Sequence, residues 1–223
     1  DRVRPFVIRT EKRNAIDAEG QPLFKPRVTR LQAVAWQARH GAQQRLYEAV
    51  TDYVRHGYNQ ALAAKQRHIG FLMILMQRLV TSSTAAIRTT LEKRQALLNE
   101  PQPQPQASLF DSTEMDEWAE LDGQSQVDIA VQTSGWVQEK AEVDLLLTLA
   151  RETEAQGTDA KAEALLELIY KLQQEENDPT MKVLIFTEFV PTQAMLAGFL
   201  ESRGFSVALL NGSMDLDTRT KAQ

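Results

Sequence analysis

The stretch Ile69-Gly-Phe-Leu-Met-Ile-Leu-Met-Gln-Arg-Leu-Val80 is apolar on nearly every side of a helix. Such a helix is stable in water only when neighbouring elements cover it. Met73 and Met76 are therefore expected to lie in a core rather than in an open groove for a partner. The run is far shorter than the roughly 20 apolar residues of a membrane-spanning helix, so we expect no membrane contact.

Amphipathic helices are predicted on both sides of this stretch. Upstream, apolar residues recur at three-, four- and seven-residue spacings over residues 42–66. Downstream, the hydroxyl residues at 82–84 offer helix N-caps. The helix that follows places these residues on one face: Ile87, Leu91, Arg94 and Leu98. Residues 31–98 are thus predicted to form a helical block.

Residues 99–135 differ in composition. They contain Pro-Gln-Pro-Gln-Pro-Gln followed by scattered acids, and such a segment buries too little apolar surface to order itself. We predict a linker or insertion, whose acidic stretch could bind a protein partner. Helical spacing returns within residues 136–178, in two helices of which the second is capped by Thr158 or Asp159.

The end of the sequence predicts a β-α-β unit. Lys182-Val-Leu-Ile-Phe-Thr187 is a continuous β-rich run, typical of a strand covered on both faces. Pro191 can open a helix that ends at Gly204, and residues 205–210 supply a second strand. The two strands should be parallel, with a right-handed crossover. The predicted fold class is a mainly α-helical block followed by an incomplete α/β segment.

The two halves of the chain carry opposite charge. Residues 1–98 hold 17 Lys and Arg against 7 Asp and Glu, a net charge of +10, whereas residues 99–223 hold 8 against 23, a net charge of −15. A strongly basic segment attracts polyanions such as nucleic acids by counterion release. A basic helical face that packs on the acidic half of the same chain explains the pattern equally well.

Composition also limits the chemistry and the compartment. Cys is absent, which excludes disulfides and thiolate metal sites and suits a reducing compartment. The three histidines show no His-x-x-x-His or Glu-x-x-His spacing, so no metal site is expected. The first residues lack the apolar stretch of a signal peptide. We expect a cytoplasmic protein, associated with the nucleoid if it is bacterial.

Several motifs resemble, in order, those of the Swi/Snf-type ATPases of helicase superfamily II. The sharpest resemble the opening of the second RecA-like lobe: Lys182-Val-Leu-Ile-Phe-Thr-Glu-Phe189, then a helix, then Leu210-Asn-Gly-Ser213 and Arg219. Weaker matches precede them: Arg9-Thr-Glu-Lys12, where the family has Arg in place of Thr10, Gln44-Arg-Leu-Tyr47, and residues 161–172. Within the family, the bacterial branch is the more similar.

The resemblance implies a domain order and a RecA-like fold, of the P-loop NTPase type, for the last segment. The segments are the end of the first lobe or a connector (1–30), a basic helical protrusion (31–98), an acidic linker or insertion (99–135), a helical region leading into lobe two (136–178), and the start of the helicase C-terminal lobe (179–223). We expect this lobe to continue beyond Gln223.

The resemblance further implies the activity of the parent protein: an ATP-dependent helicase or translocase, with ATP and Mg²⁺ as cofactors, that moves along double-stranded DNA and remodels or displaces protein–DNA complexes. The chain contains no Gly-Lys dipeptide and hence no Walker A loop. Asp116-Glu117 imitates a metal-binding box, but no predicted strand precedes it. The chain alone is therefore expected to bind neither cofactor and to be inactive. The alternative is a non-catalytic helical interaction module.

Candidate contacts to DNA phosphates follow from the resemblance. Thr187 ends the first predicted strand, at the edge where open α/β sheets bind ligands. Gly212 and Ser213 offer an N–H group and a hydroxyl in the turn after the second strand. An ordinary role in a turn or a cap is the alternative for each of these residues.

Charged candidates lie at both ends of the chain. Arg219 could contact a phosphate or pair with a neighbouring aspartate, Asp215 or Asp217. Arg9 and Lys12 belong to a basic cluster that could lie beside DNA or at the hinge between the lobes. A solvated run of charge is the alternative for this cluster.

Overall fold

A computed structural model of the chain describes residues 12–24, 28–64, 67–99, 121–132, 135–136, 138–157, 159–212 and 214. They belong to two units, within residues 1–33 and 34–223. The described part is mainly helical. Its longer helices are α1 (Gly41–Ala64), α2 (Arg67–Ser82), α3 (Thr84–Asn99), α5 (Gly123–Ala130), α6 (Glu139–Gln156), α7 (Ala160–Glu175) and α8 (Val190–Glu201).

The first unit contains a 3-10 turn, η2 (Lys12–Asn14), and a tight polar turn after it. The Oδ1 atom of Asp17 accepts hydrogen bonds from the backbone N–H groups of Glu19 and Gln21, at 3.1 and 2.7 Å. Gly20 adopts a φ of +80°, which glycine tolerates without steric cost. The polar residues from Asp17 to Gln21 thus form a turn.

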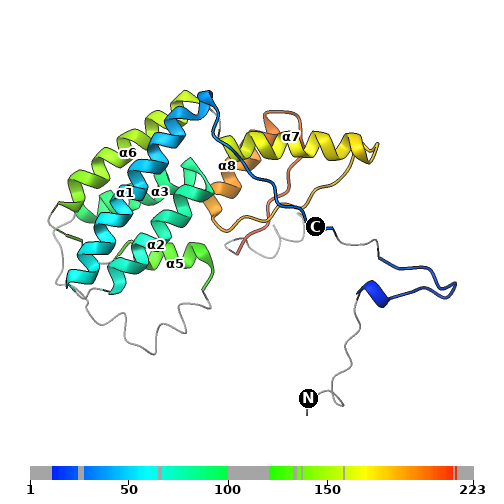
Figure 1. Cartoon of the computed structure of the whole chain (residues 1–223), viewed down its shortest axis with the longest axis horizontal. Helices are drawn as coiled ribbons and strands as arrows, with labels where there is room; N and C mark the ends of the chain where they lie inside the picture. Colours follow the sequence, from blue (N-terminus) through cyan, green and yellow to red (C-terminus); the bar gives the residue numbers. More distant parts are fainter. Residues whose placement is uncertain are drawn as a thin grey trace, which may run out of the picture. The chain divides into compact units, whose positions relative to one another are not determined.

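Helices α1, α2, α3 and α6 pack side by side in the second unit (Figure 1). Helix α1 contacts α2 and α6, and α3 contacts the same two helices from its own side. A short 3-10 turn, η3 (Ala38–His40), leads into α1. The prediction of helices over residues 42–98 is confirmed, and the helices cover one another's apolar faces. Residues 31–37, which the predicted block included, form no helix.

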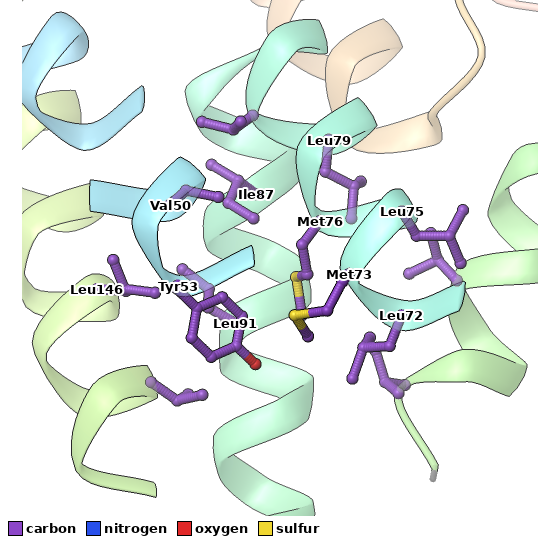
Figure 2. Close-up of a cluster of buried hydrophobic side chains, with 14 of the residues drawn as sticks. Val50, Tyr53, Leu72, Met73, Leu75, Met76, Leu79, Ile87, Leu91 and Leu146 are labelled. Carbon is purple, nitrogen blue, oxygen red and sulfur yellow. The ribbon is translucent and has the colours of Figure 1, made fainter. Parts of the chain in front are cut away.

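Methionines and leucines of α2 fill the centre of this bundle (Figure 2). Met73 and Met76 have no exposed surface, so their prediction as core residues is confirmed. Gly57 of α1 lies so close to Met73 that a β-carbon at this position would collide with the methionine sulfur. The close approach of α1 and α2 therefore depends on a missing side chain.

Capping side chains begin the helices where the sequence predicts them. The Ser83 hydroxyl accepts a hydrogen bond from the Ala86 N–H at 3.1 Å, at the start of α3. Asp159 accepts from the N–H groups of Lys161 and Ala162, at 2.9 and 3.4 Å, at the start of α7. Each cap satisfies N–H groups that the first helical turn leaves without partners.

Helix α5 lies inside the segment that composition predicts to be a linker. The Asp122 carboxylate caps it by accepting from the Ser125 N–H at 2.9 Å, and this hydrogen bond lowers the pKa of Asp122. Val127 and Ala130 are buried against α2. The prediction was wrong for residues 123–130, because an average over an acidic segment hides one short apolar face. Residues 100–120 lie outside the described residues.

The two predicted strands of the β-α-β unit are not formed among the described residues. Residues 182–187 and 205–210 flank α8 without regular secondary structure, and no backbone ladder joins them. A strand requires a hydrogen-bonded neighbour about 4.8 Å away, which apolar β-branched residues alone cannot supply. The described residues therefore do not show the two predicted strands, although the helix between them is present. Gly204 follows α8 with a φ of +87°.

None of the described helices combines the length and the apolar character that a membrane crossing requires.

Candidate functional site

Thr187 lines a pocket of about 400 Å³. The pocket lies where the end of α2, the start of α7 and the start of α8 meet. Helix α2 contributes Arg78, Thr81 and Ser82; α7 and its cap contribute Asp159, Lys161, Ala162 and Leu165; the remaining wall is Phe186 to Phe189 with Thr192, Met195 and Leu196. Side chains more than 100 residues apart in sequence thus share one cavity.

The first turn of α8 lines this pocket. Phe189 anchors the turn, because its side chain is buried and its backbone is extended. Pro191 suits the first turn of a helix, where its missing N–H removes no hydrogen bond. Phe189, the N-cap residue of α8, makes no side-chain cap hydrogen bond. The start of α8 therefore presents N–H groups without intrahelical partners and a partial positive charge.

Three hydroxyl groups hold α8 in place. The Thr192 hydroxyl is buried and lies 2.8 Å from the hydroxyl oxygens of both Ser82 and Ser83. These serines form the junction between α2 and α3. The hydroxyl of Thr187, by contrast, makes no hydrogen bond to a described residue, so it remains available to a ligand.

Two cationic side chains line the pocket. The Lys161 ammonium donates a hydrogen bond to the Thr81 carbonyl at 2.5 Å and forms no ion pair with a described residue. The Arg78 guanidinium forms an ion pair with Glu188 and donates to the Gln126 side-chain oxygen at 3.1 Å. Lys161 therefore has no direct ion-pair partner among the described residues, whereas Arg78 has Glu188.

Two carboxylates balance these cations. Asp159 accepts from the Gln43 amide at 2.7 Å and the Thr84 N–H at 3.3 Å, in addition to the two N–H groups of α7. Its charge is spread over these donors. Glu188 has Arg78 as its partner and is 41% exposed. An anion that enters the pocket would thus be repelled mainly by Glu188.

Of the candidate phosphate contacts from the sequence, Thr187 and Gly212 lie in different places. Thr187 lines the pocket. Gly212 is exposed in a turn that Gln193 of α8 holds, by bonds of 2.9 Å to the Leu210 carbonyl and 2.8 Å to the Asn211 amide. This turn is outside the pocket lining.

Other candidates stay predictions. Arg9, Ser213 and Arg219 lie outside the described residues. Lys12 belongs to the first unit, where its ammonium lies 5.4 Å from the centre of the Phe24 ring. Within the described ranges, no group of three or more His, Cys, Asp or Glu side chains is placed to hold a metal ion. The Asp116-Glu117 pair also falls outside those ranges.

Sequence patterns missed Arg78 and the role of Lys161 in the pocket. Arg78 sits in the apolar stretch that forms α2, and only its charge near a helix end distinguishes it in the sequence. Lys161 follows a capping aspartate at the start of α7, a position where a cation is unusual because the helix dipole disfavours it. That unfavourable placement is the one local signal of a site.

No protein-family model matches this chain, and neither a curated protein nor a solved structure matches it.

Proposed function

We propose that the chain is part of an ATP-dependent double-stranded DNA translocase of the Swi/Snf type, and that the pocket at Thr187 contacts a backbone phosphate of the DNA. In this proposal residues 179–223 belong to a second RecA-like lobe of parallel strands. One observation carries this proposal. Thr187, a candidate from the sequence motif, lines the same pocket as Lys161, Arg78 and the first turn of α8.

The chemistry of the pocket suits phosphate rather than bases. A free hydroxyl, an ammonium and helix N–H groups are donors to phosphate oxygens and carry no sequence information. A motor that moves along DNA needs contacts of this kind at every step. ATP and Mg²⁺ would be bound by the parent protein, since this chain has no Walker A loop.

A second candidate is a non-catalytic helical interaction module. One observation favours it: apolar side chains around α8 are strongly exposed, Leu184 at 79%, Phe186 at 88% and Leu210 at 53%. Exposed apolar patches mark surfaces that bind other proteins. Such a module would bind duplex DNA weakly, because its net charge of −5 repels the phosphates.

The Thr187→Val substitution tests the first proposal, because it removes the hydroxyl and keeps the shape. We expect affinity for a fluorescent 20-base-pair duplex, followed by anisotropy, to fall about two- to tenfold, the range for one lost hydrogen bond. In the parent protein, DNA-stimulated ATP hydrolysis should fall more than the basal rate.

Thr148→Val is the matched control. Thr148 is exposed on α6, and its hydroxyl donates only to the Asp144 carbonyl at 3.0 Å. This variant should bind the duplex as the unchanged chain does. Equal affinities for both variants would contradict a phosphate contact at Thr187 and favour the interaction module.

A further inference from the structure

Arg78 and Glu188 form an ion pair in the lining of the pocket, between α2 and the segment that precedes α8. Both side chains are 41% exposed, so either can reach water. Glu188 follows Thr187 directly in the chain, and both line the pocket. A phosphate that binds the Thr187 hydroxyl would therefore lie near the Glu188 carboxylate and be repelled by it.

Helix α5 helps to hold this arrangement. The second N–H arm of Arg78 donates to Gln126 of α5 at 3.1 Å. Glu188 packs on Gly123, the first residue of α5, so closely that a β-carbon there would lie 2.7 Å from the Glu188 Oε1 atom. The Glu188 carboxylate thus interacts with two positive groups: the N-terminal end of α5 and the Arg78 guanidinium. These contacts keep Glu188 in the pocket and Arg78 in position when no anion is bound.

We propose that Arg78 is a further phosphate-binding residue of this pocket, and that a DNA phosphate replaces the Glu188 carboxylate on its guanidinium. This inference rests on the proposed function. A guanidinium binds carboxylate and phosphate through the same planar fork of N–H donors, so the two anions compete for one partner. Gln126 keeps the guanidinium in place while its anionic partner changes.

The exchange changes the charge that the pocket offers. With Glu188 in place, Arg78 and Lys161 are matched by Glu188 and Asp159. When Glu188 turns toward solvent, the pocket gains one net positive charge and Arg78 regains its N–H donors. Glu188 therefore acts as an internal competitor that lowers the affinity for weakly held anions.

Four proteins test the exchange: the unchanged chain, Glu188→Gln, Arg78→Gln and the double variant. Each binds the same 20-base-pair duplex at several salt concentrations. Glu188→Gln should tighten binding about two- to fivefold, the size of one partly exposed charge interaction. In the Glu188→Gln background, Arg78→Gln should weaken binding and reduce the salt slope by about 0.9, the value for one lost phosphate contact.

The decisive comparison is Arg78→Gln with and without Glu188. If Arg78 only neutralised Glu188, its removal would weaken binding in the unchanged background and have no effect once Glu188 is Gln. That result would overturn the proposal. Glu152→Gln on α6 and Arg55→Gln on α1 are controls for the loss of one exposed charge, and neither should change the affinity in this way.

Two further experiments distinguish the exchange from a loss of folding and from binding of an anion other than DNA. Should Arg78→Gln unfold on loss of its Gln126 contact, Arg78→Lys replaces it, and unchanged duplex affinity of that variant would overturn the proposal. Displacement of the duplex by equimolar pyrophosphate would overturn the assignment to a DNA phosphate.

The variants also distinguish failure of the exchange from failure of the proposed function. If Thr187→Val weakens binding but the Arg78 and Glu188 variants do not alter it, the exchange is wrong and the proposed function stands. If no variant binds the duplex, the proposed function fails with it.

Discussion

Arg94 is a charged side chain without any exposed surface. Its guanidinium forms a two-pronged pair with Glu139, each N–H···O distance being 2.7 Å, and donates to the Val131 carbonyl at 2.6 Å. Tyr53 donates its hydroxyl to the same carboxylate at 2.9 Å. Burial, and then the negative charge of Glu139, raises the pKa of Tyr53 well above its ordinary value. The network joins three helices in the centre of the bundle.

The Arg94→Met substitution should be strongly destabilising, although methionine matches the apolar surroundings. It leaves the Glu139 carboxylate buried with only the Tyr53 hydroxyl, and breaking a buried pair in this way costs about 3–5 kcal/mol. Urea unfolding followed by circular dichroism measures the change in unfolding free energy.

Arg151→Met provides the comparison for Arg94. Arg151 pairs with Glu92 at 3.1 Å but is 59% exposed, so its loss should cost less than about 1 kcal/mol. Similar losses for the two variants would show that Arg94 contributes no more than a surface charge.

At the scale of helices, two glycines have opposite roles. Gly57 lies where α1 meets Met73 of α2 and Trp136, and a β-carbon there would collide with both side chains. Gly198 lies on the exposed side of α8, where a β-carbon would meet nothing within 4 Å. The same substitution should therefore change stability in opposite directions at these two positions.

Gly57→Ala should lower the free energy of unfolding by about 1–3 kcal/mol, because overpacking forces the neighbouring side chains to move. Gly198→Ala should raise it by about 0.4–1 kcal/mol, because alanine restricts the unfolded chain and favours the helix. Thermal unfolding of both variants gives the two signs. A stabilised Gly57→Ala variant would show that α1 and α2 can separate without loss of packing.

Across the whole molecule, ion pairs join the basic and acidic halves of the chain. Cations of the first half pair with acids of the second at Arg39–Glu163, Arg78–Glu188, Arg88–Glu154, Lys93–Asp128 and Arg94–Glu139. Packing of a basic helical face on acidic helices therefore accounts for part of the charge division. Arg45 on α1 is an exposed cation that pairs with no described residue, so it is available to a polyanion.

Duplex affinity of the chain should fall linearly with salt on a double logarithmic plot. Arg45 is exposed on α1 and pairs with no described residue, so Arg45→Gln should reduce the slope by about 0.9 if α1 faces DNA. Lys93→Gln should leave the slope unchanged, because its charge already has Asp128 as a partner at 2.6 Å. A flat salt response of the unchanged chain would exclude the basic half as a DNA contact.

The sequence by itself determined what depends on near neighbours in the chain. Helical periodicity, the caps at Ser83 and Asp159, and the buried face that includes Arg94 follow from interactions within a few residues. The sequence also indicated Thr187 as a candidate, through a motif.

Only the tertiary structure decided which distant groups meet. It paired Arg94 with Glu139 across 45 residues and brought Arg78 to Glu188 across 110. It placed α5 in the core, and it gave residues 182–187 no strand partner within the described part of the chain. Periodicity tells which face of an element is buried, but not what covers it. Ion pairs, pockets and β-ladders depend on that second fact, because each needs a partner from elsewhere in the chain.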